Sequence, residues 1–150
     1  MIEWIRKSFI QANTGILSTL NTSDKFTSTT HVRIVYKKGV FYITRSVLFN
    51  RLMQEITFSD HSSLLLQDDN NSHIFLLYGN SSIIEKNLDE DWKTFDTLPT
   101  INLQDNKSRM ILESFLSKRS IIQFIPNKIT AWKNGDYSKE PQIIDIELIL

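Results

Sequence analysis

The sequence contains no cysteine, only three prolines and four glycines, and no long run of apolar residues. Without cysteine there are no disulfides, no thiolate metal ligands and no cysteine nucleophile, which fits a reducing compartment. An apolar run of about 18 residues, which a membrane-spanning helix requires, is missing. Isolated glycines form no Gly-rich phosphate loop, and all four are isolated: Gly15, Gly39, Gly79 and Gly135.

An excess of charge of either sign is also missing, because 17 basic and 17 acidic side chains cancel. A nucleic-acid-binding domain carries a basic surface, so this balance argues against nucleic acid as a partner. The N-terminal segment "MIEWIRK" mixes acidic and basic residues, which interrupt the apolar core that a signal peptide needs. We therefore expect a cytoplasmic protein that binds neither nucleic acid nor a membrane.

The length of 150 residues predicts a single domain, residues 1–150. A domain of this size buries roughly 70% of the surface that its unfolded chain exposes, so it needs neither a disulfide nor a metal to fold. His31, His61 and His73 have no metal-ligand spacing, and we expect no metal site.

Strand patterns dominate the chain, because short β-branched and apolar runs alternate with turn-forming residues. The predicted strands are residues 16–21, 27–36, 40–44, 62–67, 73–86 and 120–132, and the predicted helical segments are residues 2–13, 47–58 and parts of 88–119. Gly15 is expected to end the first helix, and Gly79 to mark a bulge or a close approach of two backbones. Consecutive strands joined by short turns predict a mainly β (α+β) fold, an antiparallel barrel or sheet with flanking helices.

The segment "YKKGVFYITRS", residues 36–46, raises the question of function. It has the pattern of two strand pieces joined by a Lys-Gly turn, and it ends in the polar residues Thr44, Arg45 and Ser46. A strand that runs into solvent also ends in polar residues, so a solvated strand end is one interpretation. The other is that an anion binds there, held by hydroxyl groups and a guanidinium.

Arg33 lies in the middle of the preceding predicted strand. Its alternation with Val32 and Ile34 places Arg33 on the polar face, opposite the core. Solvent exposure explains a cation less well in mid-strand than at a frayed strand end. Arg33 is therefore the main candidate for contact with an anionic partner, with a salt bridge as the alternative.

Several short motifs follow one another along the chain: "GILSTLN", "HVRIVYKKGVFYITRS", a helix with "NRL", "SSLLLQ", "YGNSSII" and "IIQFIPNKITAW". Their order resembles the pyridoxamine 5'-phosphate oxidase-like FMN-binding split-barrel family. The resemblance covers about residues 10 to 135 and implies an antiparallel split β-barrel. Residues 136–150 form a C-terminal tail, whose segment 143–150 is expected to be an edge strand or a partner-binding segment.

The resemblance also implies a cofactor site for FMN. In such proteins the second and third strands hold the phosphate and the ribityl chain, and a tryptophan late in the last strand borders the flavin ring. The matching positions for the phosphate and ribityl chain are Arg33, Lys37, Thr44, Arg45 and Ser46, and the matching tryptophan is Trp132. A flat aromatic side chain suits contact with a flavin ring, although core packing is an equal alternative for Trp132.

Two departures from the family pattern limit what the resemblance implies. The family often has a lysine two positions after the strand-end serine, where this chain has Leu48, so Arg45 or Arg51 would have to compensate. The family's oxidases also carry an Arg-x-His-type substrate motif beyond the tryptophan. The segment "KNGDYSKEPQ" contains neither residue, so oxidation of pyridoxamine phosphate is not expected.

The resemblance therefore implies a homodimer that binds FMN between its subunits and acts as an FMN-dependent oxidoreductase on an unidentified small-molecule substrate. Two alternatives stay open. One is a barrel that binds another planar ligand, such as haem or a deazaflavin. The other is a cofactor-free barrel that works as a binding or stress-related module.

Overall fold

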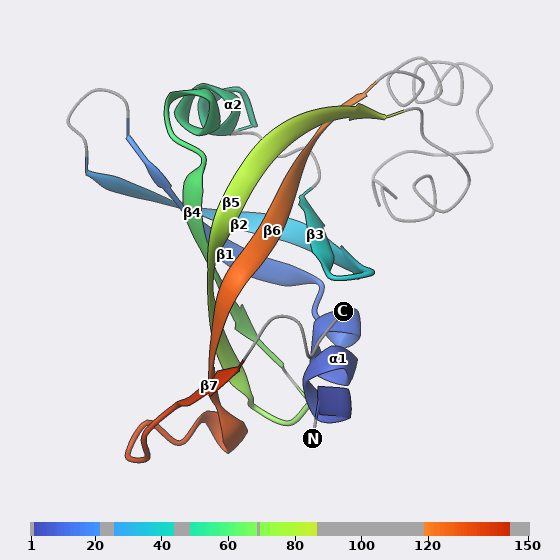
Figure 1. Ribbon diagram of the computed structural model, residues 1–150, viewed down its shortest axis with the longest axis vertical. Coiled ribbons are helices and arrows are strands. Elements are labelled where there is room, and N and C mark those ends of the chain that lie inside the picture. The colour runs from blue at the N-terminus through green and yellow to red at the C-terminus, as the bar shows by residue number, and fades with distance from the viewer. Residues whose placement is uncertain (1, 22–25, 44–48, 69, 87–118, 145–150) are drawn as a thin grey trace, which may run out of the picture. The chain divides into compact units, whose positions relative to one another are not determined.

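A computed structural model of the protein describes residues 2–21, 26–43, 49–68, 70–86 and 119–144 (Figure 1). The helices are α1 (Ile2–Gln11), α2 (Phe49–Phe58) and the 3-10 turn η1 (Lys133–Gly135). The strands are β1 (Thr14–Leu20), β2 (Thr27–Lys37), β3 (Val40–Ile43), β4 (His61–Gln67), β5 (Ile74–Lys86), β6 (Arg119–Trp132) and β7 (Gln142–Ile144).

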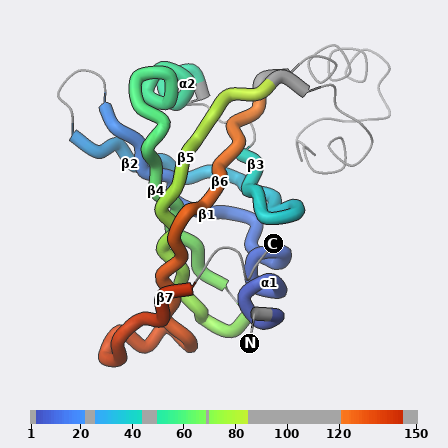
Figure 2. The backbone as a smooth tube through the Cα atoms, in the orientation of Figure 1, coloured from blue at the N-terminus to red at the C-terminus, as the bar shows by residue number. Residues whose placement is uncertain are grey.

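The strands form one antiparallel sheet in the order β3-β2-β1-β4-β5-β6-β7. An additional pairing of β3 with β6 closes the first six strands into a barrel, and β7 extends the sheet beyond β6. The path of the chain in Figure 2 shows the long strands β5 and β6 running side by side. The predicted mainly β, antiparallel barrel with flanking helices is therefore confirmed.

The pattern of contacts between residues divides the chain into two compact units. The first consists of Met1–Ile83 with Ile122–Leu150, and it contains the barrel core and both α-helices. The second is Ile84–Ile121, of which only the ends of β5 and β6 are described. The helical insert predicted within residues 88–119 lies outside the described residues, apart from Arg119, which begins β6. The single-domain expectation stays a prediction.

The first predicted helix ends earlier than its sequence pattern suggested. It stops at Gln11, and Gly15 lies within β1 instead of ending the helix. Gly15 is buried there, and a Cβ atom on it would lie 2.7 Å from Cδ2 of Leu66 and 3.1 Å from the carbonyl oxygen of Leu65. The glycine is thus explained by close packing between β1 and β4, which a helix-stop pattern does not reveal.

Aromatic side chains join α1 to the interior of the barrel. The ring of Phe9 meets Phe41 and Phe75 edge-on, with centroids 5.1 and 5.0 Å apart, and also contacts Tyr36. Edge-to-face pairs of this kind stabilise a core beyond the area they bury. Burial raises the pKa of the Tyr36 phenol, although a hydrogen bond with the Gly39 backbone and the charge of Arg6 oppose that rise.

The turn between β2 and β3 depends on two residues with positive φ. Lys38 has φ of 49° and Gly39 has φ of 83°. Two consecutive positive φ angles suit a two-residue hairpin whose twist matches the flanking strands, and glycine accepts this conformation without strain. The predicted Lys-Gly turn is confirmed, and it fixes the register in which Ile34 pairs with Ile43.

Asp68 joins the turn after β4 to α1. Its carboxylate accepts hydrogen bonds from the Ser8 hydroxyl at 2.7 Å, the Asn70 backbone N–H at 2.9 Å and the Asn71 amide at 3.3 Å. Burial by itself raises the pKa of Asp68, but these hydrogen bonds outweigh it and hold the pKa below its ordinary value. The ionised carboxylate therefore stabilises the folded state.

We expect Asp68→Asn to lower the free energy of unfolding at neutral pH by about 1–2 kcal/mol, because hydrogen bonds to a charged acceptor are lost. A folded-state pKa below the unfolded value means that the contribution is complete above a pH of about 4 and is lost as pH falls further. Urea unfolding at neutral and acid pH measures this. The exposed Asp60, changed to Asn, is the control, and an equal loss in both variants would contradict the role of Asp68.

None of the helices that the structure describes is long and apolar enough to cross a membrane.

Candidate functional site

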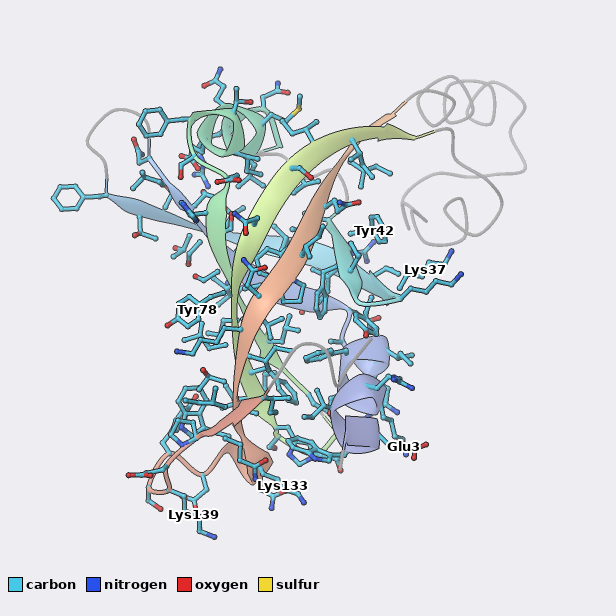
Figure 3. The ribbon with its side chains drawn as sticks, viewed as in Figure 1. Glu3, Lys37, Tyr42, Tyr78, Lys133 and Lys139 are labelled. Carbon is cyan, nitrogen blue, oxygen red and sulfur yellow. The ribbon has the colours of Figure 1, made fainter. Side chains whose placement is uncertain are left out.

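The outward face of β2 presents two of the predicted site residues. Arg33 and Lys37 are exposed on this face, whereas Val32 and Ile34 point into the barrel with 3% and 1% of their surface exposed. The predicted alternation along β2 is therefore confirmed. Figure 3 shows Lys37 at the end of the β2–β3 hairpin, reaching away from the strands.

Apolar surface lies next to Arg33 on the outside of the barrel. The strand pairings align His31, Ile16, Leu65 and Leu76 in one row across β2, β1, β4 and β5. Ile16 and Leu76 are half-buried, and Leu65 is 38% exposed. Directly opposed residues in a sheet have Cβ atoms about 5 Å apart. Ile16, Leu65 and Leu76 therefore form a continuous apolar strip. A cation and an apolar strip thus share one face.

Arg51, on α2, belongs to a buried polar cluster. Its Nη2 donates a hydrogen bond to the Thr30 hydroxyl, and its Nε lies 3.6 Å from Oε1 of Glu55. Glu55 also accepts a 2.5 Å hydrogen bond from the Thr19 hydroxyl. Thr19, Thr30 and Glu55 are buried, so this cluster attaches α2 to β1 and β2. A contact of Arg51 with a phosphate stays a prediction. In such a contact the phosphate would share the guanidinium with Thr30 and Glu55.

Thr44, Arg45 and Ser46 lie outside the described residues. β3 ends at Ile43, which pairs with Ile34 of β2. Their predicted cofactor contacts remain predictions.

Trp132, the last residue of β6, is half-buried. Its ring centroid is 5.7 Å from that of Tyr137, which is itself exposed, so Trp132 packs at the surface of the protein and not in the core.

The chain does not bring Trp132 to Arg33. Ile122 of β6 pairs with Ile43, which pairs with Ile34 of β2. Ile122 therefore lies in the row of residues next to the row that contains Arg33. Trp132 is ten positions further along β6 (132 minus 122), which corresponds to about 33 Å of strand. That path along the strand is longer than an FMN molecule.

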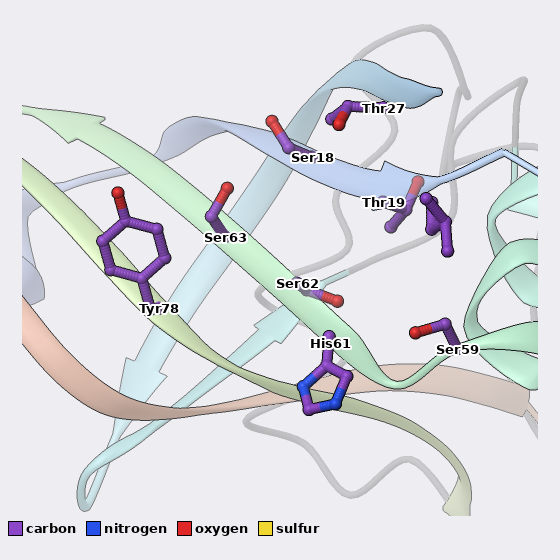
Figure 4. A pocket seen from close by; sticks show the side chains of 9 residues that line it. Ser18, Thr19, Thr27, Ser59, His61, Ser62, Ser63 and Tyr78 are labelled. Atoms are coloured by element: carbon purple, nitrogen blue, oxygen red, sulfur yellow. The ribbon is translucent and has the colours of Figure 1, made fainter. Parts of the chain in front are cut away.

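Sequence reasoning missed a pocket on the outer face of the barrel, with a volume of about 340 Å³ (Figure 4). Its lining residues are Ser18, Thr19, Leu20, Thr27, Ser59, His61, Ser62, Ser63 and Tyr78. Strand register brings them together, because Ser18 pairs with Ser63 and Ser63 pairs with Tyr78. Ser18, Ser63 and Tyr78 are far apart in the sequence, and no single motif could have revealed the pocket.

A scan against models of known protein families finds no match, and a search of curated proteins also finds none. Solved structures do resemble the chain. A Clostridium acetobutylicum protein related to general stress protein 26 of B. subtilis (pyridoxinephosphate oxidase family) has a TM-score of 0.66 at 12% identity, with 99% of this chain and 96% of that chain covered. General stress protein 26 from Bacillus anthracis has a TM-score of 0.60 at 15% identity, with coverages of 94% and 98%.

Structures with ligands in their names share the fold as well. A pyridoxamine 5'-phosphate oxidase-related, FMN-binding protein from Nostoc punctiforme has a TM-score of 0.53 at 9% identity, covering 96% of this chain and 92% of its own. A haem-binding protein from Mycobacterium smegmatis and an F420 reductase have TM-scores of 0.60 and 0.57, both at 13% identity. They cover 96% and 82% of this chain, and 58% and 94% of their own.

At these identities the likeness concerns the fold, which is the fold that the sequence motifs predicted. The chain has the split β-barrel of the pyridoxamine 5'-phosphate oxidase-like proteins.

Proposed function

We propose that the protein is an FMN-binding homodimer in which each FMN lies between two subunits. It would act in the cytoplasm as an oxidoreductase of the pyridoxamine 5'-phosphate oxidase-like type, on a small molecule that is not identified. The observation that carries this proposal is the outer face of β2, where the exposed cation Arg33 lies beside an apolar strip on a barrel of this fold.

The outer face of β2 fits the two chemically different ends of FMN. The phosphate end is anionic, and an arginine fork binds phosphate oxygens through charge-assisted hydrogen bonds. The flavin ring is flat and largely apolar, and the strip that contains Ile16 and Leu65 offers it dispersion contacts. Lys37, on the same face of β2, adds a second positive charge.

A second subunit is needed to complete the proposed site. The predicted ring contact, Trp132, lies far along β6 from the row beside Arg33 of the same chain. A two-fold dimer brings the same surface of both copies together, so Arg33 of one copy and Trp132 of the other can meet across the interface. The exposed Leu65 supports contact through this face, because apolar surface there would be buried by a partner.

When bound, FMN supplies the hydride-transfer chemistry, and the protein supplies binding, orientation and electrostatics. In this proposal Arg33 fixes the phosphate, the apolar strip orients the ring, and the second subunit keeps water away from it. Pyridoxamine phosphate is not the expected substrate, since the segment "KNGDYSKEPQ" after Trp132 contains neither arginine nor histidine.

A different planar ligand is the second candidate. Structures of this fold include a haem-binding protein and an F420 reductase. Leu48, at the position where the family often has a phosphate-binding lysine, favours a ligand other than FMN. The same departure also supports the cofactor-free module.

The absorption spectrum of the purified protein, followed by titration of the ligand-free form with FMN, tests the proposal. We expect a flavin spectrum or saturable quenching of flavin fluorescence, with one FMN per chain and a dimer by light scattering. A haem or deazaflavin spectrum would replace FMN by that ligand. A protein that binds none of the three would support the cofactor-free module, and a monomer with bound FMN would contradict the shared site.

A further inference from the structure

The hydroxyl-lined pocket on the outer face of the barrel has a chemistry of its own. Hydroxyl groups come from seven of its nine lining residues, the exceptions being Leu20 and His61. None of the lining residues is an arginine, lysine, aspartate or glutamate. Figure 4 shows Ser18, Ser63 and Tyr78 on three neighbouring strands, with His61 and Ser62 at the start of β4.

Most of these hydroxyl groups are available to a ligand. Thr19 donates to Glu55, and the Ser62 hydroxyl lies 3.3 Å from the backbone oxygen of Asp60. The other hydroxyl groups of the pocket form no hydrogen bond within the part of the chain that the structure describes: those of Ser18, Thr27, Ser59, Ser63 and Tyr78. A hydroxyl can donate one hydrogen bond and accept two, so this group presents both donors and acceptors to a ligand.

Register places three of these groups in one line across the sheet. Ser18 is directly opposite Ser63, and Ser63 is directly opposite Tyr78. Neighbours of this kind have Cβ atoms about 5 Å apart. Tyr78 is 46% exposed, and its ring gives the line an aromatic end. A ligand with several hydroxyl groups along an apolar ring skeleton matches this pattern.

We propose that this pocket binds a neutral, polyhydroxylated small molecule of the size of a sugar. Such a ligand both donates and accepts hydrogen bonds, as the pocket does, and its C–H faces pack against Leu20 and the ring of Tyr78. A phosphate or carboxylate only accepts hydrogen bonds and requires a compensating charge, and no Arg or Lys lines the pocket. The nearby ammonium of Lys128 is engaged with the Tyr78 ring, 5.9 Å from its centroid. The volume of about 340 Å³ lies at the lower end of the range for small-molecule sites.

The pocket lies beside the apolar strip proposed for the flavin ring, because Ser18 and Ser63 are each two positions along their strands from Ile16 and Leu65. It is separate from the proposed phosphate position at Arg33. Ser18 is four positions along β1 from Thr14, the residue that pairs with Arg33, which corresponds to about 13 Å of strand. Neither Arg33 nor Trp132 lines the pocket. The inference therefore does not depend on the protein being a flavoprotein.

The test is a titration of the ¹⁵N-labelled full chain with D-ribose and with ribitol, followed by amide chemical shifts. We expect saturable shifts at millimolar concentrations, centred on Ser18, Ser63 and Tyr78. The double variant Ser18→Ala/Ser63→Ala should weaken binding about tenfold or more, because two neutral hydrogen bonds are lost. Ser82→Ala, which removes an exposed hydroxyl of β5 outside the pocket, should bind as the wild type does.

Several results would overturn the proposal. These are an absence of saturable shifts for both compounds, and equal affinities of the double variant and the wild type when both give folded spectra. Tighter binding of ribose 5-phosphate than of ribose would indicate an anion site at His61 instead. Shifts of the same amides on protein dilution alone would indicate that a second copy covers the pocket. Displacement of ribose by FMN would make the pocket part of the cofactor site.

Discussion

Replacing Arg33 by alanine is expected to weaken FMN binding by about ten- to a hundredfold while leaving the fold intact. A charge-assisted hydrogen bond contributes roughly 1.5–3 kcal/mol, which corresponds to this change in affinity. The fold should survive because Arg33 is exposed on the outer face of β2 and lies outside the core. Flavin fluorescence titration gives the affinity, and circular dichroism verifies the fold.

Riboflavin is the matched control ligand, since it lacks the phosphate. It should bind Arg33→Ala and the wild type almost equally, whereas general damage to the site would weaken both ligands together. Unchanged FMN affinity in a folded variant would contradict the role of Arg33, and Arg45 would become the next candidate.

Mixing two variants extends this prediction to the shared site. Arg33→Ala and Trp132→Ala should each weaken FMN binding in both sites of the dimer. After unfolding and refolding together, a heterodimer has one site that contains both original side chains and one that contains neither. Random assembly then restores tight binding at about a quarter of the sites, because half of the dimers are mixed. No recovery in a dimeric mixture would contradict a site built from two subunits.

Changing Gly79 to alanine is expected to lower the free energy of unfolding by about 3 kcal/mol, more than Asp68→Asn or Gly15→Ala does. This loss corresponds to a drop of roughly 6–12 °C in Tm. A Cβ atom at Gly79 would lie 2.1 Å from the carbonyl oxygen of Ile125 and 2.8 Å from Cα of Pro126. Both are backbone atoms of β6, so relief requires a shift of the strand itself. Thermal unfolding followed by circular dichroism measures the change.

Gly15→Ala is the matched control, because Gly15 is also a buried glycine in a strand. There the shortest contact of a new Cβ atom, 2.7 Å, is to the end of the Leu66 side chain. A side chain can move more easily than a strand, so the loss should be clearly smaller than for Gly79→Ala. Equal losses would show that backbone contact with β6 is not the cause.

Pro126, which takes part in the contact with Gly79, is an unusual residue within a long strand. Pro126 lies between the residues of β6 that pair with β3, which end at Phe124, and those that pair with β7, which begin at Ile129. A proline lacks the N–H group that a ladder needs, and a gap between two ladders tolerates this loss. The sequence prediction that Gly79 marks a close approach of backbones is confirmed.

The sequence by itself determined features that depend on near neighbours in the chain. Alternation with period two placed Arg33 on the outer face of β2, because successive side chains of a strand point to opposite sides. The Lys-Gly pair predicted the β2–β3 turn, since glycine adopts positive φ without strain. Short turns between strands predicted an antiparallel barrel or sheet, and the structure shows the barrel. Each of these properties follows from backbone geometry within a few residues.

Only the tertiary structure decided which distant side chains meet. Arg51 looked like a cation available for a phosphate, yet its guanidinium donates to Thr30 and faces Glu55. The line of Ser18, Ser63 and Tyr78 exists because two strand registers coincide. A one-residue slip in either pairing would turn one of these side chains to the other face of the sheet, and local sequence patterns do not fix such pairings between separate segments.

The distance between Arg33 and Trp132 is the clearest case of a property that the sequence could not supply. The two residues matched two motifs of the same family, but the length of β6 separates them within a chain. Long-range pairings set that distance, because closing the barrel through β3 and β6 fixes where along β6 the row of Arg33 falls. The motifs therefore named the members of the proposed site, and the closed barrel decided how far apart along the sheet they lie.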